Sequence, residues 1–557
     1  MKVLRSALAS SWLIALGLVA LAACNPDSNP GPQGDSHTNW LRTCGADSEC
    51  GELSCVCGIC TRSCEDASDC SGAPGATCFD AKAEGAVAAC AGAAPPISGM
   101  CLPSCRDADC GPGFSCSAGA CVPEAAPTVE VAVNPAASLQ TLVGFGATVG
   151  YAEDELTALT ERAELDAAMF AGLGLDVLRF RNRYGEVSDA QLAQAQSLVT
   201  AATSSLGRKP LVLLSSWSPP ASLKQNGATF CVSGPSSCTL KLLPAGGFDY
   251  VGLAQHWRGT LEAYAKVGLA PDYIGIQNNP DWAPVAGAAA EACKFLPAEG
   301  IEEVSASGVL TPIRYPGYAE ALSAVLEELS SLPSVPKLLA PDLVGVHGAK
   351  RYFDALDTTR VDAIAHHLYG SDASNLDLAS LTALGELQAS MALPIFQTEM
   401  QADGFDTALL IHHALVSEGA AMYLQTALVG ARSGPATNPT ALIGLEGGEF
   451  VLQDPYFAMQ HYAQHTDPGY TRVGATSTNA SLLVSAWRSP QDESLTVVLI
   501  NSGFVTQAVS LDVGDGRSFS LSRTVFGGQE RMADLGILPS GASISLPPRS
   551  MATARFD

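Results

Sequence analysis

Pro210-Leu-Val-Leu-Leu-Ser-Ser-Trp217 is a short apolar run that ends in polar and aromatic residues, and the chain contains eight runs of this kind. Stretches with helical spacing separate them, among them Asp189–Leu206, Phe248–Val267, Tyr315–Leu332 and Thr407–Glu418. Eight strand–helix units over about 300 residues predict an α/β fold, a (β/α)8 TIM barrel. The runs are Leu142–Gly146, Val177–Phe180, Pro210–Ser215, Tyr273–Gln277, Lys337–Pro341, Val361–His367, Pro394–Thr398 and Ala420–Leu424.

A doubly wound sheet would also alternate strands with helices. Its dinucleotide fingerprint needs three spaced glycines, and Gly144-Phe-Gly146 lacks the third, so the barrel is the better interpretation.

The predicted barrel is flanked by β-rich sequence. Beyond Tyr470 the helical spacing stops, and runs such as Leu482–Trp487 predict an antiparallel β-sandwich. Thr128–Val133 has strand character as well. We therefore expect a strand at 128–135 that joins the sandwich, a barrel over 136–455 and the sandwich over 456–557.

Fourteen of the eighteen cysteines lie between Cys44 and Cys121, where apolar side chains are too few for a core. This density predicts a disulfide-rich module over 44–123 and an oxidising compartment, with the pairing left open. Cys55-Val-Cys57-Gly-Ile-Cys60 would also suit zinc, and the acidic loops between cysteines would suit calcium. We favour disulfides and a solvated acidic face, because acids rather than histidines separate the cysteines and no EF-hand spacing occurs.

The chain begins with a basic and then an apolar segment. Lys2 and Arg5 precede the apolar residues 7–23, a run too short to span a membrane comfortably. Its end, Leu21-Ala-Ala-Cys24, resembles the lipobox of bacterial lipoproteins. That resemblance implies a signal peptide at 1–23, a lipidated Cys24 and a flexible tether over 24–43. The alternative is a soluble secreted protein that is cleaved near Cys24.

Composition excludes some classes of protein. Hydrophobic residues make up 47% and charged residues 15%, so disorder throughout the chain is excluded. A net charge of −26 argues against a nucleic-acid partner, because phosphates would be repelled.

Polar and aromatic side chains follow the predicted barrel strands at the end where barrels carry their chemistry. Amides, aromatics, a histidine and a carboxylate at one mouth suit a sugar, which offers apolar faces and hydroxyl groups. The candidates are Arg179, Trp217, Asn278, His367, Tyr369 and Glu399.

These residues occur in motifs that resemble glycoside hydrolase family 30 over about Val131 to Asp557. The family implies retaining hydrolysis of β-linked sugars, either xylan-type polysaccharides or β-glucosides. The resembling segments are Gln140-Thr-Leu-Val-Gly-Phe-Gly146, Trp217-Ser-Pro-Pro-Ala-Ser-Leu-Lys-Gln-Asn226, Ile274-Gly-Ile-Gln-Asn-Asn-Pro-Asp-Trp282, His367-Leu-Tyr-Gly370, Gln397-Thr-Glu399 and Asp467-Pro-Gly-Tyr-Thr-Arg-Val473.

Retaining hydrolysis uses two carboxyl groups, and the resemblance supplies only one of them. It implies that Glu399 is the nucleophile, whereas the acid/base position holds Asn279, which has no proton to give near neutral pH. The family's tryptophan after strand 8 is also missing from Met422-Tyr-Leu-Gln-Thr426. Asp281, Glu291 and Glu299 are the nearby acids that could substitute.

Several candidates have structural alternatives. His366 and His367 face opposite sides of a strand, so we expect His367 to bind sugar and His366 to pack in the core. Arg179 could orient Glu399 or form a structural ion pair, and Trp217 could stack on sugar or only pack at the mouth. Cys231 and Cys238 could form a local disulfide.

Two functions stay open at this point. One is a surface-anchored retaining glycosidase that uses Glu399 with an altered acid/base at Asn279. The other is a glycan-binding lipoprotein that has lost turnover. Both predict a β-linked glycan as partner, a lipid anchor in the bacterial envelope, a monomer, and neither cofactor nor metal.

Overall fold

The computed structural model describes most of the chain beyond residue 128 and parts of the cysteine-rich region. The described residues are 40–41, 50–51, 53–56, 59–71, 75–79, 99–105, 110, 114–117, 119–123 and 128–557, without 151–155, 157–158, 160–161, 232–237, 285–289, 307–308, 370–377, 432–439, 447–448 and 504. The predicted signal peptide and lipidated Cys24 lie outside these residues, as does the tether apart from residues 40–41.

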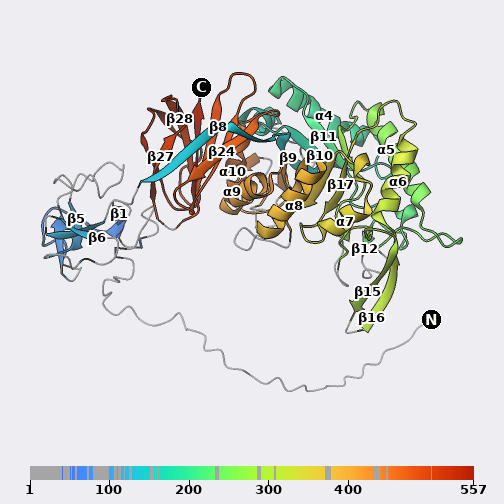
Figure 1. Ribbon diagram of the computed structural model, residues 1–557, viewed down its shortest axis with the longest axis horizontal. Coiled ribbons are helices and arrows are strands. Elements are labelled where there is room, and N and C mark those ends of the chain that lie inside the picture. The colour runs from blue at the N-terminus through green and yellow to red at the C-terminus, as the bar shows by residue number, and fades with distance from the viewer. Residues whose placement is uncertain are drawn as a thin grey trace, which may run out of the picture.

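Eight parallel strands close into a barrel, which confirms the predicted fold (Figure 1). Each strand pairs with the next along the chain, and the last pairs with the first through Met422 and Gly144. Every strand falls on one of the eight predicted runs. They are β9 (Gly144–Gly150), β10 (Val177–Arg181), β11 (Leu211–Ser215), β13 (Tyr273–Gly275), β17 (Lys337–Leu343), β18 (Ala363–His367), β19 (Ile395–Met400) and β20 (Met422–Gln425).

The strands are apolar on both faces because helices cover the outside of the barrel. On β10, Val177 points into the barrel core, whereas Leu178 and Phe180 pack against the helices. The helices are α3 (Arg162–Asp166), α4 (Asp189–Leu206), α5 (Tyr250–Lys266), α6 (Tyr318–Leu329), α7 (Ala349–Ala355), α8 (Leu378–Met391), α9 (Gly404–His413) and α10 (Asp454–Ala463).

Helix α4 shows how local sequence sets these boundaries. The Ser188 side chain accepts a hydrogen bond from the Gln191 backbone N–H, and the Gln191 side chain accepts one from the Ser188 backbone N–H, so a capping box starts the helix. Gly207 ends it in the left-handed conformation, at φ 69°, that glycine adopts without strain. The helix therefore has the bounds predicted from its spacing.

A curled nine-stranded sheet forms the second domain, next to the barrel (Figure 1). Its order is β29-β28-β31-β26-β25-β24-β8-β27-β30, and all its pairs are antiparallel except that of β8 with β27. Its strands are β8 (Val129–Thr141), β24 (Thr471–Ser477), β25 (Leu482–Arg488), β26 (Leu495–Asn501), β27 (Gln507–Asp512), β28 (Phe519–Val525), β29 (Ala533–Leu538), β30 (Ser543–Leu546) and β31 (Ser550–Phe556).

Strand β8 joins this sheet as predicted, but it is longer than the predicted 128–135. Val129, Val131 and Val133 alternate with exposed residues and bury one face in the sheet core. The strand continues to Thr141, pairing with β24 past the irregularity at Asn134. The barrel domain therefore begins near residue 142 rather than at the predicted residue 136.

Helix α10 lies where the prediction had placed the start of the sandwich, and it packs against barrel and sheet alike. Its fully buried His461 contacts Thr553 on β31 and Thr524 on β28 through its two ring nitrogens, at 2.8 and 2.9 Å. The sheet itself resumes at β24.

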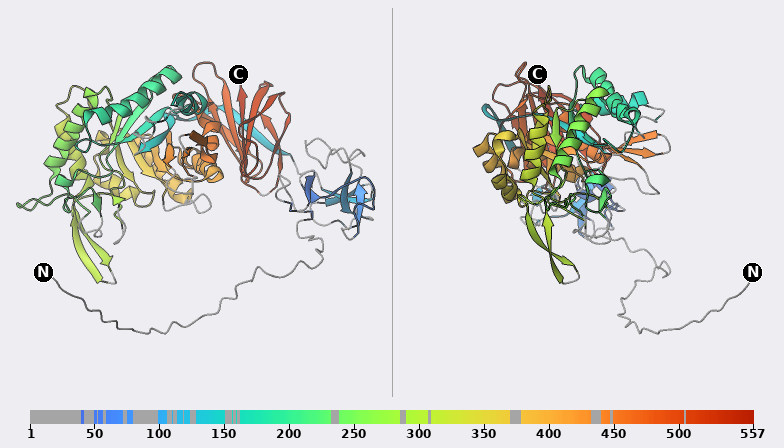
Figure 2. Two further views of the ribbon diagram at one scale, coloured as in Figure 1. Left: turned by 180° about the vertical axis from the view of Figure 1, so that it is seen from behind. Right: turned by 90° about the vertical axis from the view of Figure 1, so that its right-hand side faces the viewer.

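Short strands lie in the segments that follow several of the barrel strands. β12 (Phe230–Cys231) pairs with β14 (Ala290–Glu291), and the hairpin of β15 (Gly300–Ala306) and β16 (Val309–Tyr315) projects from the barrel (Figure 2). A three-stranded sheet follows the last barrel strand, made of β21 (Val429–Ala431), β22 (Ile443–Glu446) and β23 (Glu449–Leu452).

The cysteine-rich module lies beyond the nine-stranded sheet, away from the barrel (Figure 2). Its strands are short: β1 (Ser54–Val56), β2 (Ile59–Thr61), β3 (Ser63–Cys64), β4 (Ala76–Phe79), β5 (Gly99–Pro103), β6 (Phe114–Ser117) and β7 (Ala120–Pro123). Its described disulfides are Cys50–Cys60, Cys64–Cys78, Cys70–Cys101, Cys105–Cys116 and Cys110–Cys121.

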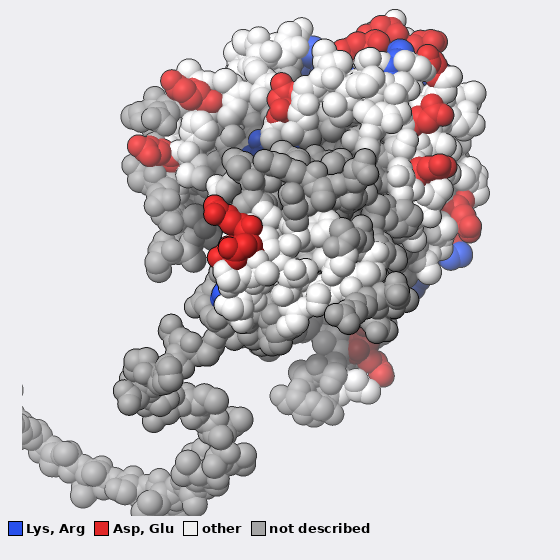
Figure 3. Space-filling model, turned by 90° about the vertical axis from the view of Figure 1, so that its left-hand side faces the viewer, with Lys and Arg blue, Asp and Glu red and all other residues white. Residues whose placement is uncertain are grey.

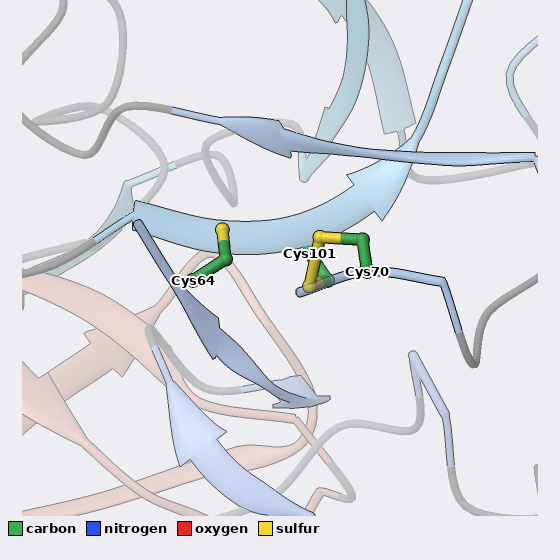
Figure 4. A group of neighbouring side chains, drawn as sticks. All are labelled: Cys64, Cys70 and Cys101. Atoms are coloured by element: carbon green, nitrogen blue, oxygen red, sulfur yellow. A yellow bond between two sulfur atoms is a disulfide. The ribbon is translucent and has the colours of Figure 1, made fainter. Parts of the chain in front are cut away.

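Three sulfur atoms of this module lie close enough together to suggest a metal site. Figure 4 shows them on Cys64, Cys70 and Cys101. Cys70 is bonded to Cys101, and Cys64 is bonded to Cys78, so none of the three is a free thiolate. Disulfides therefore account for this cluster without zinc.

Acidic side chains are scattered over the end of the molecule that carries the module, and basic ones are fewer there (Figure 3). None of the helices in the described part of the chain is both long and apolar enough to span a bilayer.

Candidate active site

Arg179 is the centre of a polar network inside the carboxyl end of the barrel. Its Nη1 donates to Glu399 Oε2 at 2.6 Å, and its Nη2 donates to Asn278 Oδ1 at 2.6 Å and to Asp342 Oδ2 at 3.0 Å. The side chain is fully buried, and it points inward because it alternates with Leu178 and Phe180 on β10. One guanidinium thus joins the ends of β10, β13, β17 and β19.

Glu399 is the carboxylate of this network that reaches solvent, with 7% of the residue exposed. Its second oxygen, Oε1, accepts a hydrogen bond from Tyr369 Oη at 3.0 Å. The pairing of β19 shifts register around this position, and such irregularities re-aim side chains at barrel rims. Burial, followed by the charge of Glu399, raises the pKa of Tyr369, so the phenol stays a donor.

Asp342 is a second carboxylate in the network, and the sequence analysis missed it. It accepts from Thr398 Oγ1 at 2.5 Å and from Ser215 Oγ at 3.2 Å, and it is fully buried. Burial alone would raise its pKa, but Arg179 and the other neighbouring donors hold the pKa of Asp342 well below its usual range. The signal was its place directly after the predicted strand Lys337–Pro341.

Asn279 lies four residues after β13 with a left-handed backbone, φ 49°, which asparagine tolerates better than most residues. Its backbone N–H donates to Asp342 O at 2.9 Å. The residue is partly exposed, but its Oδ1 is buried without a hydrogen-bond partner. Its neighbour Asn278 is buried, and the Asn278 side-chain oxygen accepts the hydrogen bond from Arg179.

Aromatic side chains also lie close to this network. The guanidinium carbon of Arg179 lies 4.7 Å from the ring centroid of Trp217, which is half-buried. Trp282 is 37% exposed, and its backbone N–H donates to Asn279 O at 3.1 Å. The exposed indole beside Asn279 suits a sugar ring. Trp282 ends the family-like segment that begins at Ile274, but the prediction did not include it among the site residues.

His367 and His366 face opposite sides of β18, as expected. His367 was expected to bind sugar, but it is fully buried, with Nε2 3.3 Å from Asp342 Oδ1. Its contact is with the carboxylate beneath the mouth rather than with solvent. His366 packs outside the barrel core, where its Nε2 contacts the buried Glu418.

The His366–Glu418 pair should make stability depend on pH. Burial disfavours the imidazolium, but contact with Glu418 outweighs burial and raises the pKa of His366. The pair therefore stabilises the fold fully below the unfolded pKa of about 6.5, and this contribution is lost as pH rises through the folded pKa. Urea titrations from pH 5 to 9 should show this loss, at up to about 1.4 kcal/mol per pH unit.

A double variant, His366→Gln with Glu418→Gln, is the control because it removes both charges and keeps amides in their place. The free energy of unfolding of the wild type relative to this variant should fall with rising pH. A difference that is flat from pH 6 to 9 would contradict the assignment.

Strand β20 carries no tryptophan at the mouth. Leu424 packs into the barrel core, Gln425 Nε2 donates to Thr440 O at 2.9 Å, and Thr426 Oγ1 donates to Thr148 Oγ1 at 3.1 Å. The side chains that follow Leu424 at this end of the strand are therefore small and polar.

The acids that could replace a proton donor at Asn279 have other partners. Asp281 Oδ1 accepts from the Val344 backbone at 3.0 Å. Glu291 accepts from Arg181 Nη1 through both oxygens, at 3.0 and 3.2 Å. Glu299 contacts Tyr250 and Arg314 at the base of the β15–β16 hairpin.

Cys231 and Cys238 form a disulfide that supports this part of the mouth. Both sulfur atoms are buried, and Cys231 belongs to β12, which pairs with the strand that carries Glu291. Cys293 is a buried free thiol nearby.

A cavity of about 530 Å³ lies away from this network, at the junction of barrel and sheet. It is lined in part by Phe405, Gln453, Phe526 and Arg549, and none of the sequence-predicted site residues lines it.

The fold resembles that of solved glycoside hydrolases, although no protein-family model and no curated protein matches the chain. A glycoside hydrolase family 30 subfamily 8 xylanase from Clostridium acetobutylicum is 22% identical, with a TM-score of 0.58 over 77% of this chain and 99% of that one. A family 30 endoxylanase from Clostridium papyrosolvens C71 is 19% identical, with a TM-score of 0.58 over 77% and 100%. An endo-β1,6-glucanase is 14% identical, with a TM-score of 0.55 over 77% and 94%. At these identities the likeness shows a shared barrel-and-sheet fold.

Proposed function

We propose that the chain is a retaining glycoside hydrolase-like protein that acts on β-linked glycans, either xylan-type polysaccharides or β-glucosides. The observation that carries this is the carboxylate of Glu399, which Arg179 and Tyr369 hold from its two sides at 2.6 and 3.0 Å. The sequence motifs and the fold shared with family 30 xylanases support it.

Glu399 has the environment that a nucleophile needs. Arg179 and Tyr369 fix its orientation, and Asp342 fixes Arg179, so the carboxylate is pre-organised. Its exposed part faces the mouth, where it would attack the anomeric carbon of a bound sugar and form a glycosyl-enzyme. Trp217, Trp282 and Asn278 are the proposed sugar contacts, while His367 acts through Asp342.

The wild type should form a covalent intermediate on Glu399 with a sugar whose leaving group needs no proton. We expect 2,4-dinitrophenyl 2-deoxy-2-fluoro-β-glucoside or β-xyloside to label one peptide, the one containing Glu399, in a mass spectrum. With unmodified 2,4-dinitrophenyl glycosides, azide should accelerate turnover and give a β-glycosyl azide. Glu399→Gln keeps the side-chain shape and should not be labelled. Absence of label from both sugars would remove the main support for an enzyme.

Asn279 favours a second candidate, a glycan-binding protein without turnover, because general acid–base catalysis is worth about 10²–10⁴-fold and an amide cannot supply it. In that case xylan and β-glucan oligosaccharides would bind the wild type and Glu399→Gln equally in calorimetry, without label or product.

We infer a location outside the cytoplasm, because the described disulfides suit an oxidising compartment. Anchoring through a lipid on Cys24 and a monomeric state remain part of this proposal, and intact mass of the membrane-extracted protein would test the lipid.

A further inference from the structure

We propose that the substrates of this site are β-glycosides whose aglycone departs as a stable oxyanion, a carboxylate or a phosphate. This inference rests on the proposed function: it keeps the nucleophile and the β-glycosyl group, and it replaces the sugar–sugar linkage of a polysaccharide, whose aglycone leaves as an alkoxide, by an ester or phosphate linkage. It follows from a nucleophile, Glu399, that Arg179 and Tyr369 hold in place, and from a neutral amide, Asn279, whose backbone N–H is bonded to Asp342 of the same network.

The leaving-group position cannot give a proton but can receive an anion. Asn279 is partly exposed and its Oδ1 is buried without a partner, and the NH2 group of an amide can only donate hydrogen bonds. A carboxylate at this position would repel an anionic aglycone, whereas an amide N–H can donate to it. An amide at position 279 thus disfavours aglycones that leave as strongly basic alkoxides. It favours aglycones that leave as weakly basic oxyanions, such as carboxylates and phosphates.

The neighbouring acids have other partners within the structure. Asp281 is turned to the Val344 backbone, and Glu291 is held by Arg181 through both oxygens. Glu186, on the loop after β10, lies 3.0 Å from the same Arg181 nitrogen. Burial, and then the charge of Glu291, raise the pKa of Glu186 against the opposing effect of Arg181. Burial also raises the pKa of Asp281, against the hydrogen bond from Val344. Glu186 and Asp281 are therefore the competing donors that the test must include.

The reaction balances without a proton donor. In the first step a Glu399 oxygen bonds to the anomeric carbon, and the bond to the aglycone oxygen breaks with its electron pair, which leaves as a carboxylate or phosphate. In the second step an acceptor attacks the same carbon and Glu399 is released. An anionic acceptor needs no deprotonation, whereas water must lose its proton to solvent. Two displacements retain the β configuration.

The test compares leaving groups on one sugar. The probes are the β-glucosyl and β-xylosyl benzoates, the β-glycosyl phosphates and the methyl β-glycosides. For the wild type we expect turnover of a benzoate or a phosphate, and methyl glycosides that react at least about 10²-fold more slowly, the lower bound of what a general acid contributes. The benzoate and phosphate arms show which oxyanion the site prefers.

Variants separate this inference from its alternatives. Asn279→Gln keeps an amide and should keep the preference, whereas Asn279→Glu should lower the oxyanion-to-methyl ratio by about 10²–10⁴-fold. Methyl glycosides that react as fast as benzoates in the wild type, and that lose this turnover in Glu186→Gln or in Asp281→Asn, would overturn the proposal and assign the proton donor to the residue whose variant loses it. A Glu399 label without oxyanion preference would also overturn it, leaving the proposed function intact. Absence of the label would reject both.

Discussion

Asn279→Glu should raise the turnover of unactivated β-glycosides by about 10²–10⁴-fold, the usual contribution of a general acid. The local structure favours a proton donor there, because the Asn279 side-chain oxygen is buried without a partner. A carboxyl group in that position would be poorly solvated, and desolvation raises a carboxyl pKa toward neutral. The measurement is kcat/KM for methyl or unsubstituted oligosaccharide substrates between pH 4 and 8, where the variant should acquire a basic limb.

The backbone at this position sets a cost that the experiment must separate from chemistry. Glutamate tolerates φ 49° less well than asparagine, and the left-handed region costs about 1–2 kcal/mol for most residues. Asn279→Gln is the matched control, since it carries the same strain and length without the proton. If both variants lose stability equally and neither gains turnover, the mouth has lost more than its acid, and the glycan-binding alternative gains support.

The sequence predicted the barrel well because its signals are local. Each strand is a short apolar run, and helix α4 has its own start and stop residues, so tertiary contacts were not needed to find them. The prediction ended this strand at residue 135, whereas β8 continues to Thr141 past an irregularity in its pairing with β24.

The candidate site was predicted only in part, and the reason is again physical. Glu399 and Arg179 could be predicted from strand ends and motifs. Asp342 was not predicted, because the strand was expected to end at Pro341, whereas β17 continues to Leu343. Burial of His367 depends on how Asp342 and Tyr369 pack around it, which no local pattern encodes. Glu291 reaches Arg181 only because β12 and β14 pair across an insert.

Arg179→Met should lower the free energy of unfolding by about 3–5 kcal/mol and abolish labelling of Glu399. The guanidinium neutralises two carboxylates, Asp342 and Glu399, whose side chains are 0% and 9% exposed, and methionine would leave both without a counter-charge. Because buried, unpaired acids resist ionisation, the loss should grow as pH rises from 5 to 8. Urea unfolding at several pH values measures this.

A rescue variant shows whether charge, rather than packing, is responsible. Adding Asp342→Asn and Glu399→Gln to Arg179→Met removes both unpaired charges at nearly constant volume, so it should recover stability at pH 8 and flatten the pH dependence, still without labelling. If the Arg179→Met variant has the same free energy of unfolding as the wild type at pH 8, the two carboxylates do not need Arg179 as a counter-charge in the folded protein. The pre-organised nucleophile on which the proposed chemistry depends would then be absent, because the same guanidinium that stabilises the barrel mouth also orients Glu399.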